Sequence, residues 1–394
     1  MKYPLMRNNI QAVDLEPVIS LLQEKDPKLT AGPNVKKFET LWSDWLDVKY
    51  SVFVNSGSSA NLLALAWLKK EFPEGGRIVI PPFTWSSDVS SAIWMGFHIE
   101  FVDIRLNTLA IDENKLEQVI NSHDDIRAVF LTHAQGINGL TPKMIEICES
   151  HNIHIIEDVC ESHGVTLASG KKAGSHGIIS CFSFYYAHHM STIEGGMLCT
   201  NDPSVYQYLR MIRSHGMLRE STDSEIKNQF TNNYPDLNPL FIFTHPGFNV
   251  RNNEIGALIG ISQLRRLDDM IKKRADNFSY FLSKMPQWVF TDFSLEGQSN
   301  YAFNLILKES NPALMQRVED TFVTEQIEYR RGSAGGGNQL RQPYVRSLPQ
   351  FSTVDPSIAA PVADHIHFYG MYLGNYPELQ KNDIDYICNV INSI

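Results

Sequence analysis

The chain has 394 residues and a formal net charge of −10, with 43% hydrophobic and 20% charged residues. This length suffices for one large domain and a smaller one, and the acidic balance, without a Lys/Arg run, excludes a nucleic-acid-binding protein. The five cysteines form no CxxC pair, and no apolar leader or run of about 18 apolar residues occurs, so we expect a cytoplasmic protein without disulfides, iron–sulfur centre or membrane partner.

Strand-like runs alternate with helical patterns through roughly the first 200 residues. The run "YSVFVNSG" is typical of a strand that ends in a Gly turn, and "SSANLLALAWLKKEF" of the amphipathic helix that follows it. Further strands are expected in "RIVIPP", "HIEFVDI", "RAVFLTHA", "IHIIEDV", "GIISCFSFYY" and "GGMLCT". Strands that alternate with helices indicate a largely parallel sheet.

One long charged helix is predicted over residues 262–278, and it links to a second α/β region. We therefore expect a large domain over residues 1–260 and a smaller one over residues 261–394. The run "RRGSAGGGNQLRQP" interrupts this second region. A loop so rich in Gly and Arg either lies over a ligand or is mobile, and the residues alone leave both open.

Two early segments place polar or aromatic residues just after predicted strands. In "NSGSSANLL", Gly57 and Ser58 lie between a strand and a helix start, where backbone N–H groups and hydroxyls suit a phosphate. Ser58 or Ser59 could equally serve only as the helix N-cap. Trp85 follows a strand in "FTWSS", either as a core residue or as a platform for a flat ring.

The run "IHIIEDVCESHG" places a carboxylate at the end of a buried strand. Asp158 follows the apolar residues, at the edge of an α/β sheet where ligands bind. A carboxylate there needs a cationic partner or good hydrogen bonds, and a protonated pyridine nitrogen is such a partner; a helix cap is the alternative. Glu161 follows three residues later and can face the same pocket.

The stretch "SFYYAHHMSTIEGG" holds Ser183, which suits a phosphate, and the adjacent pair His188 and His189. On an extended segment the two histidines point to opposite faces, so they are poor joint metal ligands and we expect no metal site. We expect His189 to be structural. Further along, "RSHG" holds His215, and "HPGFNVRNNEIGAL" holds Asn249 in a loop before a helix.

The order and spacing of these segments resemble the DegT/DnrJ/EryC1/StrS sugar aminotransferases, a family of fold-type-I pyridoxal-phosphate (PLP) enzymes. The resemblance covers essentially the full chain and rests on the runs "TAGPNVKKFE", "NSGSSANLLAL", "PPFTWSS", "EDVCESHG", "FSFYYAHHMSTIEGGM", "RSHG" and "GFNVRNNEIGA". It implies an α/β fold: a three-layer sandwich with a mostly parallel central sheet and a smaller C-terminal α/β domain. It also implies a homodimer with active sites at the interface.

In most of this family a lysine binds PLP as a Schiff base, and here His188 stands in its place. A small branch shares this replacement and the runs "HHMSTIEGG" and "GGGNQLRQP", which implies that PLP or its amine form, pyridoxamine phosphate (PMP), is bound without a covalent link. The resemblance makes His188 the catalytic base, with His215 nearby. It gives Glu161, where relatives usually have Gln, a catalytic and cofactor-binding role. Another lysine-less branch has an iron–sulfur cluster, but its cysteine spacing is not found here.

The resemblance also implies the remaining contacts of cofactor and substrate. The expected cofactor contacts are phosphate binding by Gly57, Ser58 and Ser183, helped by the partner subunit's Asn249, ring stacking by Trp85 and pairing of the ring nitrogen with Asp158. Guanidinium groups suit phosphate and carboxylate oxygens. The candidate substrate anchors are Arg219, Arg330, Arg331 and Arg341, although surface arginines are often only solvated.

Imidazole can move protons but forms no stable Schiff base, which favours elimination over amino transfer. Together with this chemistry, the resemblance implies removal of the 3-hydroxyl from a nucleotide-linked 4-keto-6-deoxy sugar, with GDP-4-keto-6-deoxy-D-mannose as substrate and L-glutamate as the amino donor that restores PMP. A nucleotide-sugar aminotransferase with another base, or a 3-dehydratase for a different nucleotide sugar, are the alternatives. The retained Asp158, Ser183 and His188 disfavour a mere ligand-binding protein, and the histidine spacing disfavours a metalloenzyme.

Overall fold

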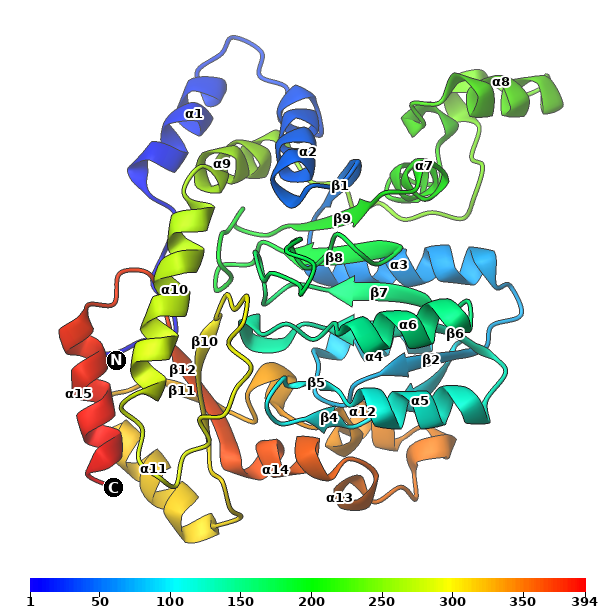
Figure 1. Ribbon diagram of the computed structural model, residues 1–394. Helices are drawn as coiled ribbons and strands as arrows, with labels where there is room; N and C mark the ends of the chain where they lie inside the picture. Colours follow the sequence, from blue (N-terminus) through cyan, green and yellow to red (C-terminus); the bar gives the residue numbers. More distant parts are fainter.

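The computed structural model describes residues 1–394 and is built around a seven-stranded sheet (Figure 1). Its order is β1-β9-β8-β7-β6-β2-β3, with β1 (Tyr50–Val54), β2 (Arg77–Ile80), β3 (His98–Phe101), β6 (Ile126–Thr132), β7 (His154–Asp158), β8 (Ile179–Ser183) and β9 (Gly196–Thr200). Only β9 runs antiparallel to its neighbours, which confirms the predicted mostly parallel sheet. A two-stranded ribbon of β4 (Ile104–Arg105) and β5 (Ala110–Ile111) stands apart.

Helices cover both faces of this sheet, because alternate side chains of each strand point into two separate cores. In β2, Ile78 and Ile80 belong to one core and Val79 to the other. The first core includes residues of α3 (Gly57–Glu71), α4 (Ser86–Trp94) and α7 (Pro203–Ile212), and the second includes residues of α2 (Pro33–Leu46), α5 (Glu113–Ser122) and α6 (Pro142–Ser150). The three layers of the predicted sandwich are thus present.

Two of these helices begin in the same way, with a capping side chain followed by proline. The Asp202 carboxylate accepts from the backbone N–H groups of Ser204 and Val205 at the start of α7, and Thr141 accepts from Met144 at the start of α6. Proline at the first helical position loses no hydrogen bond there. Such local signals fix where these helices start.

The long helix predicted over residues 262–278 is in fact two helices, α9 (Glu254–Leu264) and α10 (Leu267–Leu282). The break lies at Arg266, whose backbone has φ −118° and ψ 5°. Its guanidinium donates to the Asp14 carboxylate at 2.6 Å and to the Asn9 carbonyl at 2.9 Å. The break therefore lies where α1 (Ala12–Leu22) and the N-terminal segment dock.

A smaller α/β unit follows α10 and contains a three-stranded antiparallel sheet in the order β10-β12-β11. Its elements are β10 (Ala302–Ile306), α11 (Pro312–Thr324), β11 (Tyr329–Arg331), α12 (Pro343–Arg346), α13 (Pro356–Ala359), α14 (Pro361–Tyr369), β12 (Gly370–Gly374) and α15 (Lys381–Asn392). We keep the division at residues 260 and 261 as a proposal.

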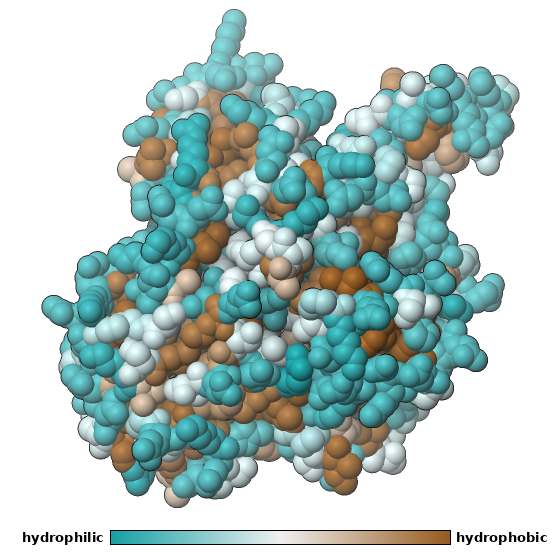
Figure 2. All heavy atoms as spheres, in the orientation of Figure 1, coloured by the Kyte–Doolittle hydropathy of each residue, from teal (hydrophilic) through white to brown (hydrophobic).

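One arm extends from the rest of the molecule at the upper right of Figure 1 and consists of α8 (Ser224–Asn233) and the short helix η3 (Pro239–Phe241). Figure 2 shows hydrophobic atoms on this arm among hydrophilic ones. Its exposed apolar side chains are Tyr234, Leu237, Leu240, Phe241 and Phe243. None of the molecule's helices combines the length and apolarity needed to cross a membrane.

Candidate active site

The predicted site residues follow strands that end at one edge of the central sheet. Strands β1, β2, β6, β7 and β8 run in the same direction, so their carboxyl ends meet there. Gly57 follows β1, Trp85 follows β2, and Asp158 and Ser183 are the last residues of β7 and β8. This edge is where open α/β sheets bind ligands.

The start of α3 lies directly against the end of β8. A Cβ atom added to Gly57 would lie 2.7 Å from the Ser183 Cβ and 3.0 Å from the Cys160 Sγ, so only glycine allows this approach. The N-cap of α3 is Ser56, which accepts from the Ser59 N–H at 3.1 Å. Ser58 is therefore not the helix cap, and it is exposed. Backbone N–H groups of this turn and two hydroxyls can bind an anion together.

Asp158 belongs to a buried pair of carboxyl groups joined by one amide. Asn61 Nδ2 donates to Asp158 Oδ2 at 3.1 Å and to Asp88 Oδ1 at 2.6 Å. The Cys160 N–H donates to the other Asp158 oxygen at 2.8 Å, and Thr132 donates to Asp88. The hydrogen-bond partners of Asp158 are an amide and a backbone N–H, neither of them a cation, so Asp158 is available to a cationic group of a ligand.

Asp88 is fully buried, and both burial and the neighbouring Asp158 charge raise its pKa well above 3.8. Because the folded-state pKa lies above the unfolded one, this carboxyl contributes most to stability below the unfolded value. The contribution declines as pH rises through the folded-state value. Asp88 thus binds its proton more tightly in the folded protein than in the unfolded chain.

The variant Asp88→Asn carries the uncharged amide at all pH values. We expect the free energy of unfolding of the wild-type protein, freed of cofactor, to fall relative to this variant by about 1 kcal/mol or more between about pH 5 and about pH 8. Urea unfolding at both pH values measures it. A difference between the two proteins that stays constant with pH contradicts the assignment.

Glu161 lies just beyond Asp158 and is held by Gln135. The backbone N–H and the side-chain Nε2 of Gln135 donate to Glu161 Oε2 at 3.2 and 3.3 Å. Burial raises the pKa of Glu161 to about 7, the Gln135 N–H lowers it, and the Asp158 charge raises it further. Near neutral pH this side chain can therefore give or take a proton.

His188 lies in a turn that follows β8, where its N–H donates to the Tyr185 carbonyl at 3.0 Å. Its Nδ1 is buried without a partner, whereas Nε2 is neither buried nor bonded to the protein. Burial, and then the Arg274 guanidinium, lower the pKa of His188 to about 3, so the imidazole is neutral. Its ring lies 5.6 Å from the Tyr301 ring. A neutral base thus presents a free nitrogen at this edge.

The expectation that His188 and His189 point to opposite faces is wrong, because the chain turns here instead of continuing as a strand. Both rings stack on His163, at 6.2 and 5.3 Å between centroids. His189 is fully buried, and its Nε2 lies 2.9 Å from the Ser299 carbonyl, in keeping with a structural residue. No group of three or more His, Cys, Asp or Glu side chains has an arrangement that could hold a metal ion.

Trp85 is 55% exposed, so it is not the core residue of the alternative interpretation. The Gly-rich segment lies beside it: Gln339 Nε2 donates to the Thr84 carbonyl at 2.9 Å, and Asn338 pairs with Phe83. A Cβ on Gly335 would lie 2.1 Å from the Thr84 oxygen. The segment is thus fixed against the end of β2, which favours the ligand-covering alternative over a mobile loop.

The four candidate arginines are not brought together. Arg330 lies opposite Tyr372 in the pairing of β11 with β12, and the Tyr372 ring lies 5.9 Å from the Tyr301 ring, which itself contacts His188. Arg331, the next residue of β11, points the other way, where it donates to the Phe368 carbonyl at 2.6 Å. The Arg341 guanidinium donates to both oxygens of the buried Asp364, at 2.5 and 2.8 Å.

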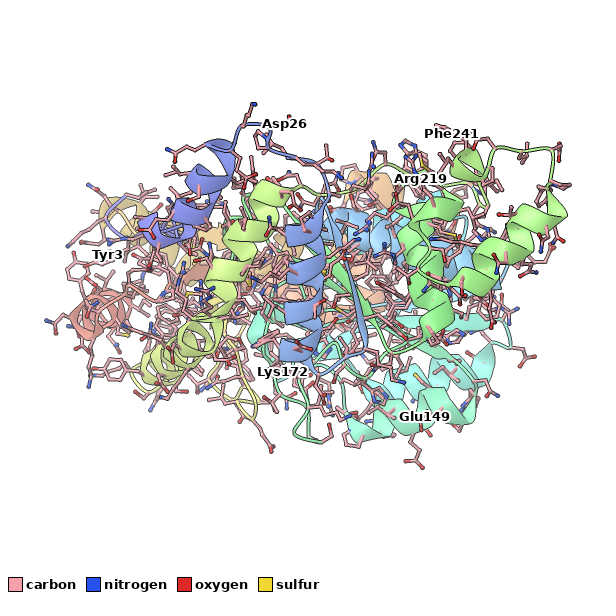
Figure 3. All side chains as sticks on the ribbon, turned by 90° about the horizontal axis from the view of Figure 1, so that it is seen from above. Tyr3, Asp26, Glu149, Lys172, Arg219 and Phe241 are labelled. Atoms are coloured by element: carbon pink, nitrogen blue, oxygen red, sulfur yellow. The ribbon has the colours of Figure 1, made fainter.

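Arg219 belongs to the short helix η2 (Leu218–Glu220), and its guanidinium stands 5.7 Å from the ring of Phe241 on the arm (Figure 3). His215 and Asn249 are exposed on two segments that pair next to each other, through Ser214 and Asn249. No hydrogen bond or ring contact joins His215 to His188 within the chain. The roles of Arg219, His215 and Asn249 stay predictions.

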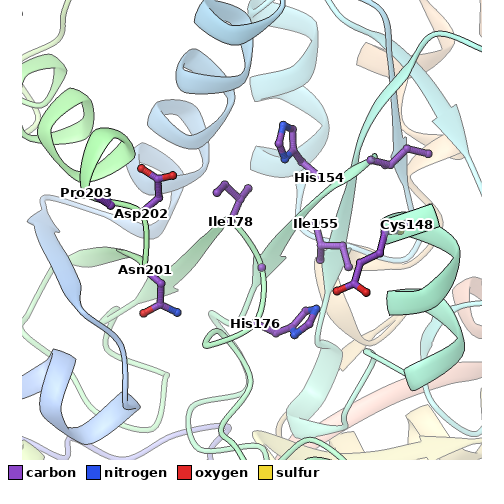
Figure 4. A pocket seen from close by; sticks show the side chains of 11 residues that line it. Cys148, His154, Ile155, His176, Ile178, Asn201, Asp202 and Pro203 are labelled. Atoms are coloured by element: carbon purple, nitrogen blue, oxygen red, sulfur yellow. The ribbon is translucent and has the colours of Figure 1, made fainter. Parts of the chain in front are cut away.

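A separate pocket of about 420 Å³ lies at the opposite edge, near the start of β7 and the end of β9 (Figure 4). His154, His176 and Asp202 are among the residues that line it. None of the predicted site residues lines it. The carboxyl edge therefore remains the candidate active site.

Sequence reasoning did not single out Asn61, Asp88, Gln135 and Tyr301, which complete this edge. Asp88 had one usable signal, since a carboxyl group in the first turn of a helix directly after a strand lies at the same sheet edge as Asp158. Nothing local marks Gln135, whose backbone φ of 58° is unusual for a residue other than Gly.

Comparisons with known proteins find relatives over nearly the whole length. A family model described as the DegT/DnrJ/EryC1/StrS aminotransferase family matches residues 9–392. GDP-4-keto-6-deoxy-D-mannose 3-dehydratase of Escherichia coli O55:H7 is 31% identical over 399 residues, with 99% of this chain and 100% of that protein covered.

Solved structures give the same result. A variant of GDP-4-keto-6-deoxymannose-3-dehydratase with bound GDP-perosamine aligns with a TM-score of 0.86 and 28% identity, over 99% of this chain and 100% of that one. The same enzyme with a trapped PLP-glutamate geminal diamine aligns with a TM-score of 0.84 and 29% identity, over 99% and 100% of the two chains.

Proposed function

Because the chain belongs to the DegT/DnrJ/EryC1/StrS aminotransferase family, we propose that it removes the 3-hydroxyl of a nucleotide-linked 4-keto-6-deoxy sugar, with GDP-4-keto-6-deoxy-D-mannose as the substrate. The observation that carries the proposal is His188, a neutral imidazole with an open Nε2 in a segment that contains no lysine. The relatives that bind GDP-perosamine and glutamate support the substrate class and the amino donor.

The residues at the sheet edge fit PLP or PMP. The close approach of Gly57 and Ser183 leaves N–H and hydroxyl donors for a phosphate, and Asp158 offers an unpaired carboxylate for a protonated ring nitrogen. Exposed Trp85 offers a flat face for the ring. Without a lysine the group would be held without a covalent link.

When bound, PLP or PMP supplies a conjugated ring that takes up the electron pair left on the neighbouring carbon when its proton is removed. Asp158 would keep the ring nitrogen protonated and so favour this. His188 would accept the proton on Nε2, the nitrogen with no protein partner, and later donate it to the departing 3-hydroxyl. Glu161 would act as a hydrogen-bond donor below about pH 7.

The overall reaction balances with L-glutamate as the reductant. The sugar carbon loses a hydroxyl and gains a hydrogen, and glutamate is oxidised to 2-oxoglutarate with release of its nitrogen as ammonia. Two electrons thus pass from glutamate to the sugar, and the product is a 4-keto-3,6-dideoxy sugar. Amino transfer would instead leave the nitrogen on the sugar, which is how the aminotransferase alternative differs.

A homodimer is part of the proposal. Its support lies in apolar side chains that one chain leaves exposed, on the arm and on the outer face of α1, where Val13, Ile19 and Leu22 are about half exposed. Exposed Asn249 would be available to the partner subunit's site. A second copy would cover both surfaces.

Product analysis tests the function. The protein would be incubated with PLP, L-glutamate and GDP-4-keto-6-deoxy-D-mannose, and the sugar nucleotide identified by mass spectrometry. The proposal predicts loss of one oxygen without gain of nitrogen. An amino sugar as the product supports the aminotransferase alternative. If this substrate stays unchanged while another nucleotide sugar loses its 3-hydroxyl, the protein is a 3-dehydratase for that other sugar.

A further inference from the structure

Gln135 links the two side chains that the proposed function places at the reacting atoms. Its N–H groups donate to Glu161 Oε2, as described above, and its carbonyl accepts from the Tyr301 N–H at 3.3 Å. The Tyr301 ring in turn packs against His188. Gln135 is fully buried, so water does not compete for these bonds.

The backbone of Gln135 is held in a left-handed conformation, with φ 58°. Neighbouring bonds fix this turn: the Gly136 N–H donates to Ser162 Oγ at 2.9 Å, and the Gly136 carbonyl accepts from Ser299 at 2.8 Å. Residues other than Gly rarely adopt this conformation, and where the surroundings enforce it the position is often functional.

The two oxygens of Glu161 are not equivalent. Oε2 accepts two N–H groups, whereas Oε1 has no hydrogen-bond partner in the protein and is not among its buried atoms. An oxygen that already accepts two donors is a poor place for the carboxyl proton. We propose that Gln135 is a positioning residue that directs this proton to Oε1, so that Glu161 offers an O–H donor to the bound ligand.

This inference rests on the proposed function. It assigns to Gln135 the positioning of the proton on Glu161, the acid of the proposed reaction. The titratable groups that face Glu161 are Asp158 at the end of β7, Tyr301 before β10 and Tyr372 in β12. Two cations act on the neighbours of Glu161: Arg274 of α10 influences Tyr301 and His188, and Arg330 of β11 influences Tyr372. None of these groups donates a hydrogen bond to the Glu161 carboxyl, whereas Gln135 donates two.

The variant Gln135→Met keeps the length of the side chain and removes its Nε2 donor, while the backbone N–H still donates to Glu161. The Glu161 carboxyl would be titrated by infrared difference spectroscopy against Glu161→Gln, in the wild-type and the variant background. Losing a donor to the charged form should move the titration midpoint upward by about half a pH unit or more. The kcat near neutral pH should fall about tenfold, with KM within about twofold.

Two variants complete the test. Gln316→Met, on an exposed part of α11, is the matched control and should change neither quantity. Gln135→Gly suits the left-handed backbone, so it serves with the same expected shift if the Met variant fails to fold. An unchanged midpoint overturns the proposal, whatever happens to the rate. If the wild-type protein does not dehydrate the sugar, the proposed function fails, and the midpoint still decides the role of Gln135.

Discussion

Replacing His188 by lysine is expected to lower the rate of dehydration by about 100-fold or more and to create a covalently bound form of PLP. The imidazole is neutral and presents Nε2 at the sheet edge, whereas a lysine there can attack the aldehyde of the cofactor. The new bond absorbs visible light and can be reduced with borohydride. Absorption spectra and a product assay on the same sample measure both effects, and amino transfer should rise as dehydration falls.

His188→Asn is the matched control for this variant. Its side chain neither exchanges protons near neutral pH nor reacts with an aldehyde, so it should lose dehydration without any covalent form. If His188→Lys still removes the 3-hydroxyl at the wild-type rate, His188 is not the base. If His188→Asn removes the 3-hydroxyl at the wild-type rate, His188 is likewise not the base.

Replacing Asp158 by asparagine is expected to weaken PLP binding by about 100-fold and to lower the rate at saturating PLP by about 100-fold. Asp158 has no cationic partner in the chain, so its charge is available to a protonated ring nitrogen. Asparagine keeps the shape and the bond to the Cys160 N–H but removes that charge. Titration of the cofactor-free protein with PLP, followed by absorbance, measures the affinity.

Asp88→Asn provides the comparison, because Asp88 lies in the same hydrogen-bonded group but its pKa is raised by burial and by the Asp158 charge. It should keep PLP affinity within about threefold. The account of the carboxyl pair is contradicted if the two variants lose affinity equally, since the charge of Asp158 would then have no special part.

Local patterns were enough to place much of this site. A Gly turn after a strand located Gly57, and an apolar run that ends in a carboxylate located Asp158 at the carboxyl edge of β7. Both signals are properties of neighbouring residues, and parallel strands then bring them to one edge. The mostly parallel sheet followed from the same alternation of strands and helices.

Contacts between distant segments could not be predicted in this way. The pairing of Asp88 with Asp158 joins a helix after β2 to the end of β7, and only the sheet order makes them neighbours. The turn at His188 ends β8 at Ser183, although its sequence continues with β-favouring aromatic residues. The hydrogen bonds from Arg341 to Asp364 depend on how α14, which contains Asp364, packs, and no local pattern shows this.

The fate of the glutamate nitrogen tests the central claim most directly. With L-glutamate carrying nitrogen-15, the account predicts that the label leaves as ammonia, one equivalent for each sugar that loses its 3-hydroxyl, and that the sugar nucleotide contains none. Label bound to carbon 4 of the sugar would contradict it, because the imidazole would then have left amino transfer intact.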